Sequence, residues 1–294
     1  MCQRECVFFG FNPKMKKCRT HKKSLTSGMS EEAGWRYYSD NDFSSMPKDC
    51  KGLRENGHSN TGVYDIYPYR TLTIPISVYC DMTTMDGGWT AIQKRVDGSV
   101  TFDRNWTDYK NGFGSPEQDV WIGNDVIHKL TKENPSSLYV SITLQNGTTL
   151  YEMYDRFSVS NEAGKYQLFL AGPATGTLGK CIHVISQYVG HPFLGRSIFV
   201  WDVYFSTPDR DLTNGQSGFN CADNGDIRGG WWFNGCHKAF LNGQWSPESG
   251  LVHGNPTDDH VSPLLVTEFT GIQHGRRFLV ERETPTTHID KSWG

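Results

Sequence analysis

Two neighbouring runs in the middle of the chain alternate apolar and polar residues, as strands do when one face lies against a core. They span Leu138–Leu144 and Thr149–Val159, and Asn146-Gly147 lies between them. An Asn-Gly pair between alternating runs is a strong hairpin signal, because both residues tolerate positive φ. These residues therefore predict an antiparallel pair of strands.

Shorter runs nearer the N-terminus predict further elements. The stretches VYDIYPY and LTIPISVYC are β-like, and Asp86-Gly87-Gly88 predicts a tight turn that leads into a strand over Trp89–Lys94. Val120–Thr131 carries apolar residues at roughly helical spacing after Pro116-Glu117, which predicts a helix. An antiparallel sheet with a few helices follows, so the predicted fold class is α+β.

The composition and the cysteines indicate where in or outside the cell the protein is located. The 31 glycines and nine tryptophans of the 294 residues favour a loop-rich fold held by aromatic residues, and the net charge of −3 gives no general case for a nucleic-acid or acidic-membrane partner. None of the eight cysteines forms a CxxC pair, which argues against zinc ribbons and favours disulfides. Sequons at Asn105 and Asn146 predict glycosylation and agree with secretion. Because no apolar signal segment is present, we expect the true N-terminus to be missing.

The chain divides into four parts. Residues 1–39 contain CQRECVFFGFNPKMKKC and GWRYYS, which resemble the last part of an apple/PAN module. Cys2 or Cys6 can pair with Cys18 across the strand-like run Phe9–Asn12; alternatively, the segment is a disordered leader that bears a disulfide. We expect a linker over 40–48, the main domain over 49–283 and a disordered tail over 284–294. Cys50 and Cys80, near the start of the main domain, would close a loop of about 30 residues and stabilise it by roughly 3–4 kcal/mol.

The main domain contains a series of specific motifs. It strongly resembles the fibrinogen C-terminal-like domain over about residues 49–245, including its ficolin- and tachylectin-like lectin members. The motifs that carry the resemblance are VYCDM, GGWT, IQKRVDGSVTFDRNWTDYKNGFG, VWIGND, YQLFLAG, FSTPDRD, NCA and WWFNGCH. The resemblance also implies a second disulfide, between Cys221 and Cys236, that holds a pocket loop against a calcium loop.

The calcium loop of this family reads roughly D-x-D-x-D and is followed by G-N-C. Asp211 matches the second acid and Asp209 matches the first, which is usually a supporting residue, but the third acid falls at Thr213. Calcium takes carboxylate and carbonyl oxygens, so the loss of one carboxylate predicts weaker binding. The alternative is that Asp209 and Asp211 only cap a turn, which Asp does well.

The resemblance also implies a small pocket for an acetylated group. Gly235-Cys236 matches the place where lectin members carry a cis peptide, which aims backbone N–H groups at an acetamido carbonyl, and His237 matches a pocket-lining histidine. A pocket tyrosine falls at Ile227, so one wall has lost its hydroxyl. We interpret His237 as a pocket residue rather than a structural one, and the double tryptophan Trp231-Trp232 as core.

Two regions depart from the family pattern. The stretch KCIHVISQYVGHPFLGRSIFVWDVY is longer and more apolar than expected, and its Cys181 is best interpreted as a buried structural thiol. It is either a strand insertion or, as we favour, a gene-model error that retained intron. Near the C-terminus, only TEF and RRFLVER resemble the strands that close the family's sheet.

These features favour a binding protein. No GxSxG, HExxH or phosphate-binding glycine loop occurs in the sequence, so we expect no enzyme. The first hypothesis is an extracellular lectin for acetylated groups in innate immunity, calcium-assisted and oligomeric in its full-length form. The alternative is a matrix or receptor-ligand module that binds a protein and no sugar.

Overall fold

The computed structural model describes fourteen stretches of the chain, and all structural statements concern these residues. They are 8–12, 17–21, 36–39, 46–69, 75–133, 136–144, 146–171, 175–177, 203–213, 219–224, 227–233, 240–246, 250–251 and 265–274. No helix in these stretches is long and apolar enough to cross a membrane.

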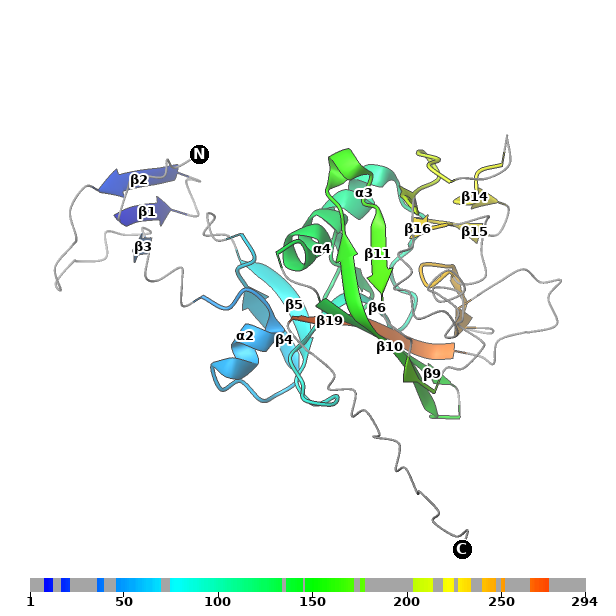
Figure 1. The fold of residues 1–294 in the computed structure, drawn as a ribbon, viewed down its shortest axis with the longest axis horizontal. Helices are drawn as coiled ribbons and strands as arrows, with labels where there is room; N and C mark the ends of the chain where they lie inside the picture. Colours follow the sequence, from blue (N-terminus) through cyan, green and yellow to red (C-terminus); the bar gives the residue numbers. More distant parts are fainter. Residues whose placement is uncertain are drawn as a thin grey trace, which may run out of the picture.

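The main domain is built on one antiparallel sheet, so the predicted α+β class is confirmed. Its described strands follow the order β11-β10-β9-β19-β6-β5-β4, and β19 lies near the middle (Figure 1). Their bounds are β4 Gly62–Ile66, β5 Ile76–Asp81, β6 Trp89–Arg95, β9 Ser136–Leu144, β10 Thr149–Val159, β11 Leu168–Ala171 and β19 Leu265–His274. Short strands β7 (Phe113–Gly114), β8 (Val120–Trp121) and β12 (Thr175–Gly176) extend it.

The predicted hairpin is confirmed as β9 and β10. Thr149 pairs with Thr143 beside the turn, and Gly147 has a φ of 80°, which is the positive value that the Asn-Gly signal predicts. The alternation also sets the faces: Leu138, Val140 and Tyr154 are buried in the main core. The register shifts between Tyr154 and Phe157, where a bulge adds to the twist of the long strand.

The predicted helix begins later than its pattern suggests. Val120–Trp121 form β8 and pair with β6, and helix α4 spans only Asn124–Thr131. Gly123, with a φ of 105°, separates the two elements. The helix start predicted at Pro116-Glu117 is wrong, because these residues lie in a turn closed by the Gln118 N–H and the Ser115 carbonyl. The apolar residues of Val120–Thr131 predicted one helix, but they belong to a buried strand and to the short helix that follows it.

Three further short helices complete the main domain. They are α2 (Cys50–Glu55), α3 (Trp106–Asn111) and the 3-10 turn η1 (Glu162–Gly164). Figure 1 shows α3 and α4 together over the same side of the sheet. Asp49 caps α2 by accepting a hydrogen bond from the Gly52 N–H at 2.8 Å, so this helix begins where the main domain was predicted to begin.

The predicted disulfide between Cys50 and Cys80 is confirmed. It joins the first residue of α2 to β5, with 5.5 Å between the two Cα atoms, and both cysteines are fully buried. The Cys50 N–H also donates to the Thr90 hydroxyl at 3.0 Å, which ties α2 to β6. The helix, which is too short to be stable alone, is thus held to the sheet at its first residue.

The N-terminal residues form a separate small sheet of order β2-β1-β3. Its strands are β1 (Phe8–Asn12), β2 (Lys17–His21) and β3 (Arg36–Ser39), so the strand-like run near Phe9 is confirmed. Cys18 lies opposite Phe11 in this sheet. Cys2 and Cys6 lie outside the described residues, so the pairing of either with Cys18 stays a prediction. Cys181 also lies outside them, so its assignment as a buried structural thiol stays a prediction.

The closing strand of the sheet is present despite the altered C-terminal sequence. Strand β19, which contains Thr267-Glu268-Phe269, pairs with β9 on one side and with β6 on the other. Backbone hydrogen bonding needs only extended residues with free N–H and C=O groups, so many sequences can fill this position. Of the departing stretch 180–204, only residues 203–204 are described, and the predicted tail over 284–294 lies outside the described residues.

One carboxyl group of the sheet is buried, and one of its oxygens has no hydrogen-bond partner within the described stretches. Glu152 of β10 is 5% exposed, and its Oε2 atom has no hydrogen-bond partner among the described residues. The Tyr154 hydroxyl, on the same face of the strand, is also buried and unpartnered there. Burial raises the pKa of Glu152 to about 7.

This carboxyl group predicts a pH-dependent stability. Its folded pKa lies above the ordinary value of 4.5, so its contribution to stability is present below that value and is lost as the pH rises through about 7. We expect Glu152→Gln to be more stable than the native chain at pH 8 by about 2 kcal/mol and to match it near pH 4.5. Urea unfolding across this pH range measures the difference. The exposed Glu117→Gln variant is the control, and an equal pH dependence in the two variants would contradict the assignment.

Candidate functional site

The residues singled out by the sequence lie in a loop-rich part after residue 203. Its described strands are β13 (Phe205–Ser206), β14 (Asp223–Asn224), β15 (Ile227–Arg228), β16 (Trp231–Trp232), β17 (Trp245–Ser246) and β18 (Gly250–Leu251). They form three two-stranded pairs, β13 with β16, β14 with β15, and β17 with β18. Figure 1 shows the yellow strands of this part at the opposite end of the molecule from the N-terminal sheet.

The double tryptophan is part of the core, as predicted. Trp231 and Trp232 are 8% and 9% exposed. The Trp232 ring lies 5.0 Å from the Phe205 ring and 6.1 Å from the Trp121 ring, measured between centroids. These aromatic contacts join β16 to β13 and to β8, so the loop-rich part is fixed to the sheet.

Tyr166 anchors this aromatic cluster, and its role could not be predicted from the sequence. Its backbone φ is 47°, and the preceding Lys165 has a φ of 59°, values that are uncommon for residues with a side chain. Its carbonyl accepts a hydrogen bond from the Trp232 indole N–H at 2.7 Å, and its hydroxyl donates to Asp125 Oδ1 at 2.6 Å. Burial raises the pKa of Tyr166, so the hydroxyl stays a donor. A strained backbone held on two sides is typical of a functional region.

Asp209 has a structural role in the predicted calcium loop. It lies in a tight turn in which Thr207 and Arg210 exchange backbone hydrogen bonds. Its Oδ1 atom accepts from the Trp106 N–H at 2.9 Å and from the Thr207 hydroxyl at 2.7 Å. Arg210 lies 3.9 Å from the Trp106 ring. The turn therefore holds the first residue of α3, in agreement with a supporting role for this acid.

Asp211 is the described carboxylate best suited to a cation. Its Oδ1 atom accepts from the Thr213 N–H at 2.9 Å and from the Thr213 hydroxyl at 2.6 Å. Its Oδ2 atom has no hydrogen-bond partner among the described residues, and the side chain is exposed. A calcium ion takes six to eight oxygens, so this donor set covers only part of a shell. No group of three potential metal-binding side chains occurs within the described stretches.

The predicted pocket residues are only partly described. Cys221 is fully buried and disulfide-bonded, and Asn220 ties it to the Asp209 turn by donating to the Pro208 carbonyl at 3.1 Å. Its predicted partner Cys236 lies outside the described residues, with Gly235, His237 and the predicted cis peptide. Ile227 pairs through its backbone with Asn224, and its side chain lies outside the description.

Both predicted glycosylation acceptors are exposed. Asn105 is the N-cap of α3, and its Oδ1 atom accepts from the Asp108 N–H at 2.9 Å. Asn146 lies at the tip of the β9–β10 hairpin, where its Oδ1 atom accepts from the Thr148 N–H at 2.9 Å. Modification of either residue stays a prediction.

The fold and the arrangement of these loops define the class of protein. The profile of the family described as fibrinogen beta and gamma chains, C-terminal globular domain, matches residues 46–256. The chain therefore belongs to the family of fibrinogen C-terminal globular domains.

Named relatives agree with this assignment. Over 198 residues the chain is 40% identical to fibroleukin of Bos taurus, covering 67% of this chain and 42% of the relative. It is 36% identical to ryncolin-4 of Cerberus rynchops, covering 71% and 54%, and 36% identical to human angiopoietin-1, covering 70% and 37%. The chain thus spans about half or less of the length of these relatives.

Solved structures agree as well. The fibrinogen-like globe domain of human ANGPTL6 matches with a TM-score of 0.63 and 32% identity, covering 79% of this chain and 96% of that one. A lamprey fibrin D-dimer in complex with the peptide Gly-His-Arg-Pro-amide matches with a TM-score of 0.62 and 28% identity, covering 82% and 78%.

The two acids of the turn can be separated by mutation. We expect Asp209→Ala to lower the free energy of unfolding by about 1 kcal/mol, because the Trp106 N–H at the start of α3 loses its acceptor. Asp211→Ala, the matched control, removes among the described residues only the contacts to Thr213 and is expected to stay within about 0.5 kcal/mol of the native chain. Urea unfolding in EDTA measures both variants. Equal losses would contradict the different roles assigned to these residues.

Proposed function

We propose that this chain is an extracellular recognition module that binds acetylated groups, such as N-acetylated sugars, and serves in innate immunity. The observation that carries the proposal is the rigid aromatic base formed by Trp231, Trp232 and Phe233. These residues are buried, and they immediately precede the segment that carries Cys236 and His237. A small pocket for a methyl group needs such a base. If the base were mobile, ordering it on binding would cost free energy and lower the affinity.

The proposed activity is binding and not catalysis. The described surroundings of the base include aromatic rings, backbone carbonyls, amide side chains and the Arg95–Asp119 ion pair. Single pockets of this size bind weakly, so the proposal includes a homo-oligomeric full-length form that gains avidity from several copies.

An extracellular location is part of the proposal. The buried Cys50–Cys80 bridge and the bonded Cys221 both require an oxidising compartment. The exposed sequons at Asn105 and Asn146 are accessible to the secretory machinery, which fits the same location.

Calcium is proposed as an assisting ion. Asp211 supplies the carboxylate, and Thr213 stands where the family's loop has its next acid. Asp209 is engaged with Trp106 and so supports the loop from behind. A site with one fewer carboxylate has lower charge and is expected to hold calcium weakly.

Capture of a peptide end or a protein ligand is the second candidate. It is favoured by the lamprey fibrin D-dimer, which binds the peptide Gly-His-Arg-Pro-amide on a similar fold. The replacement of the pocket tyrosine by Ile227 also removes a hydroxyl that an acetylated ligand would use. The partner in this case is a protein and not a sugar.

Affinity chromatography distinguishes the two candidates. We expect the protein to be retained on N-acetylglucosamine resin in calcium and to elute with acetate, because acetate competes for an acetyl pocket. His237→Ala is expected to abolish retention, and His58→Ala, which changes an exposed histidine near β4, serves as the control. Absence of retention with and without calcium would reject the sugar hypothesis. Retention on immobilised Gly-His-Arg-Pro-amide peptide instead would support the second candidate.

The cation loop can be tested by restoring the acid. We expect Thr213→Asp to tighten calcium binding by about tenfold, because a second carboxylate adds charge to the site. Isothermal titration of EDTA-treated protein measures the affinity. Thr149→Asp adds the same charge at an exposed position of β10 and is expected to change nothing. If neither the native chain nor Thr213→Asp binds calcium, the loop is not a cation site.

A further inference from the structure

Two short chain segments form the described base of the candidate site. We call them the floor: Gly230–Phe233 and Phe240–Gly243. Phe233 and Phe240 are both buried, and their ring centroids lie 5.2 Å apart. The six residues between them in the sequence, which lie outside the described residues, include Cys236 and His237.

Asn242 joins the two halves of the floor. It is fully buried, and its amide Nδ2 donates to the Gly230 carbonyl at 2.8 Å. At Gly230 a side chain would meet the Tyr109 ring, because a Cβ atom placed there lies 2.6 Å from Cε2. The separation of the two halves is therefore set by one amide hydrogen bond and by close contact with the core.

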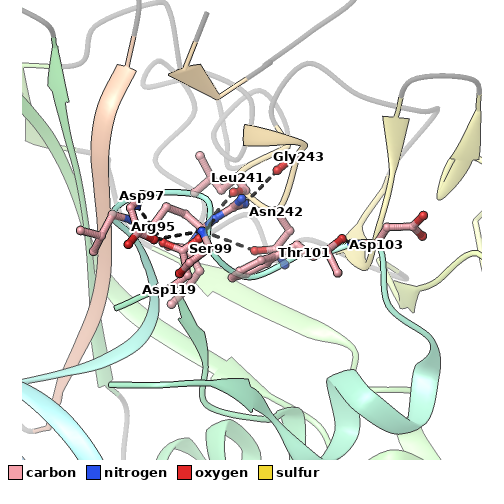
Figure 2. A network of polar contacts seen from close by, with 12 residues as sticks. Arg95, Asp97, Ser99, Thr101, Asp103, Asp119, Leu241, Asn242 and Gly243 are labelled. Atoms are coloured by element: carbon pink, nitrogen blue, oxygen red, sulfur yellow. Dashed lines mark hydrogen bonds and ion pairs between the residues drawn. The ribbon is translucent and has the colours of Figure 1, made fainter. Parts of the chain in front are cut away.

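Two side chains of β6, Gln93 and Arg95, reach the floor from the sheet. Figure 2 shows Arg95 beside Asn242 and Gly243. Gln93 Nε2 donates to the Leu241 carbonyl at 3.0 Å and lies 3.5 Å from Asn242 Oδ1. Arg95 Nη1 donates to the Gly243 carbonyl at 2.8 Å. Both residues are 1% exposed and point to the same face of β6, since they are two positions apart.

Asp119 is the buried counter-ion of the Arg95 guanidinium. Its Oδ2 lies 3.7 Å from Arg95 Nε, and its Oδ1 accepts from the Val96 N–H at 2.6 Å. The guanidinium carbon also lies 3.9 Å from the centre of the Phe102 ring. With a buried counter-ion and an aromatic face on its sides, the arginine has little freedom to leave the Gly243 carbonyl.

We propose that Gln93 and Arg95 are positioning residues that set the geometry of the floor and thereby the affinity of the site for its ligand. The identity of the ligand in this proposal rests on the proposed function. The geometry of the floor does not depend on which ligand binds. A buried ion pair is weak evidence for stability, because desolvation offsets much of its attraction. Arg95 does place a hydrogen-bond donor at the Gly243 carbonyl. The backbone of β6 pairs with β5, β8 and β19, and this pairing does not use the side chains of Gln93 and Arg95.

Gln93→Met and Arg95→Lys test this role in the full chain. The first keeps the side-chain length and removes the donor to Leu241, and the second keeps the charge beside Asp119 but removes the guanidinium fork. Ile127→Val, in the buried core of α4, is a control that lowers stability without touching the floor. Hydrogen–deuterium exchange of peptides covering the floor is compared with that of β9 and β10, and binding of N-acetylglucosamine is titrated in parallel.

We expect exchange in the floor to rise at least about tenfold in both β6 variants while β9 and β10 stay within about twofold of the native chain. Affinity for N-acetylglucosamine is expected to fall at least about fivefold, and Ile127→Val is expected to leave both readouts unchanged. Unchanged floor exchange in Gln93→Met, or an equal rise over the whole chain, would overturn the proposal. If the native chain does not bind N-acetylglucosamine, the sugar hypothesis fails, and the exchange data still decide the role of β6.

Discussion

The hydrogen bond from the buried Arg95 guanidinium to the Gly243 carbonyl is a charged link between the sheet and the loop-rich part of the main domain. On one side of it lies a regular sheet, stabilised by backbone pairing and a continuous core. On the other side lie loops whose described strands are two residues long, and such strands cannot hold a shape by backbone pairing alone. Asp119 compensates the buried charge of Arg95, and without that compensation a guanidinium could not be used at this depth.

Aromatic contacts and polar contacts stabilise these loops in different ways. The rings of Trp232, Phe205 and Trp121 supply apolar burial, which is strong but allows some sliding. The directional bonds from Gln93, Arg95 and Asn242 select one arrangement among those that burial permits. A recognition site of modest affinity needs this combination, because each degree of freedom left open in the free protein must be lost on binding.

The sheet could be predicted from the sequence far better than the site. The alternation in Thr149–Val159 and the Asn146-Gly147 turn identify their strands because register and hairpin geometry are local properties. The boundary at Gly123 was missed because β8 and α4 form one apolar run, and only the chain reversal separates them. Tyr166 and Arg95 could not be found at all, since their importance comes from partners 66 and 148 positions away along the chain.

Strand β19 has a consequence for the order in which the protein is made. It fills the gap between β6 and β9, which are complete more than a hundred residues earlier in synthesis. Until Leu265–His274 leave the ribosome, both of those strands expose an unpaired edge, and edges of this kind invite pairing with other chains. Between the synthesis of β9 and that of β19 the nascent chain therefore carries two unpaired edges, and the pairing of β19 converts both of them into the centre of the sheet.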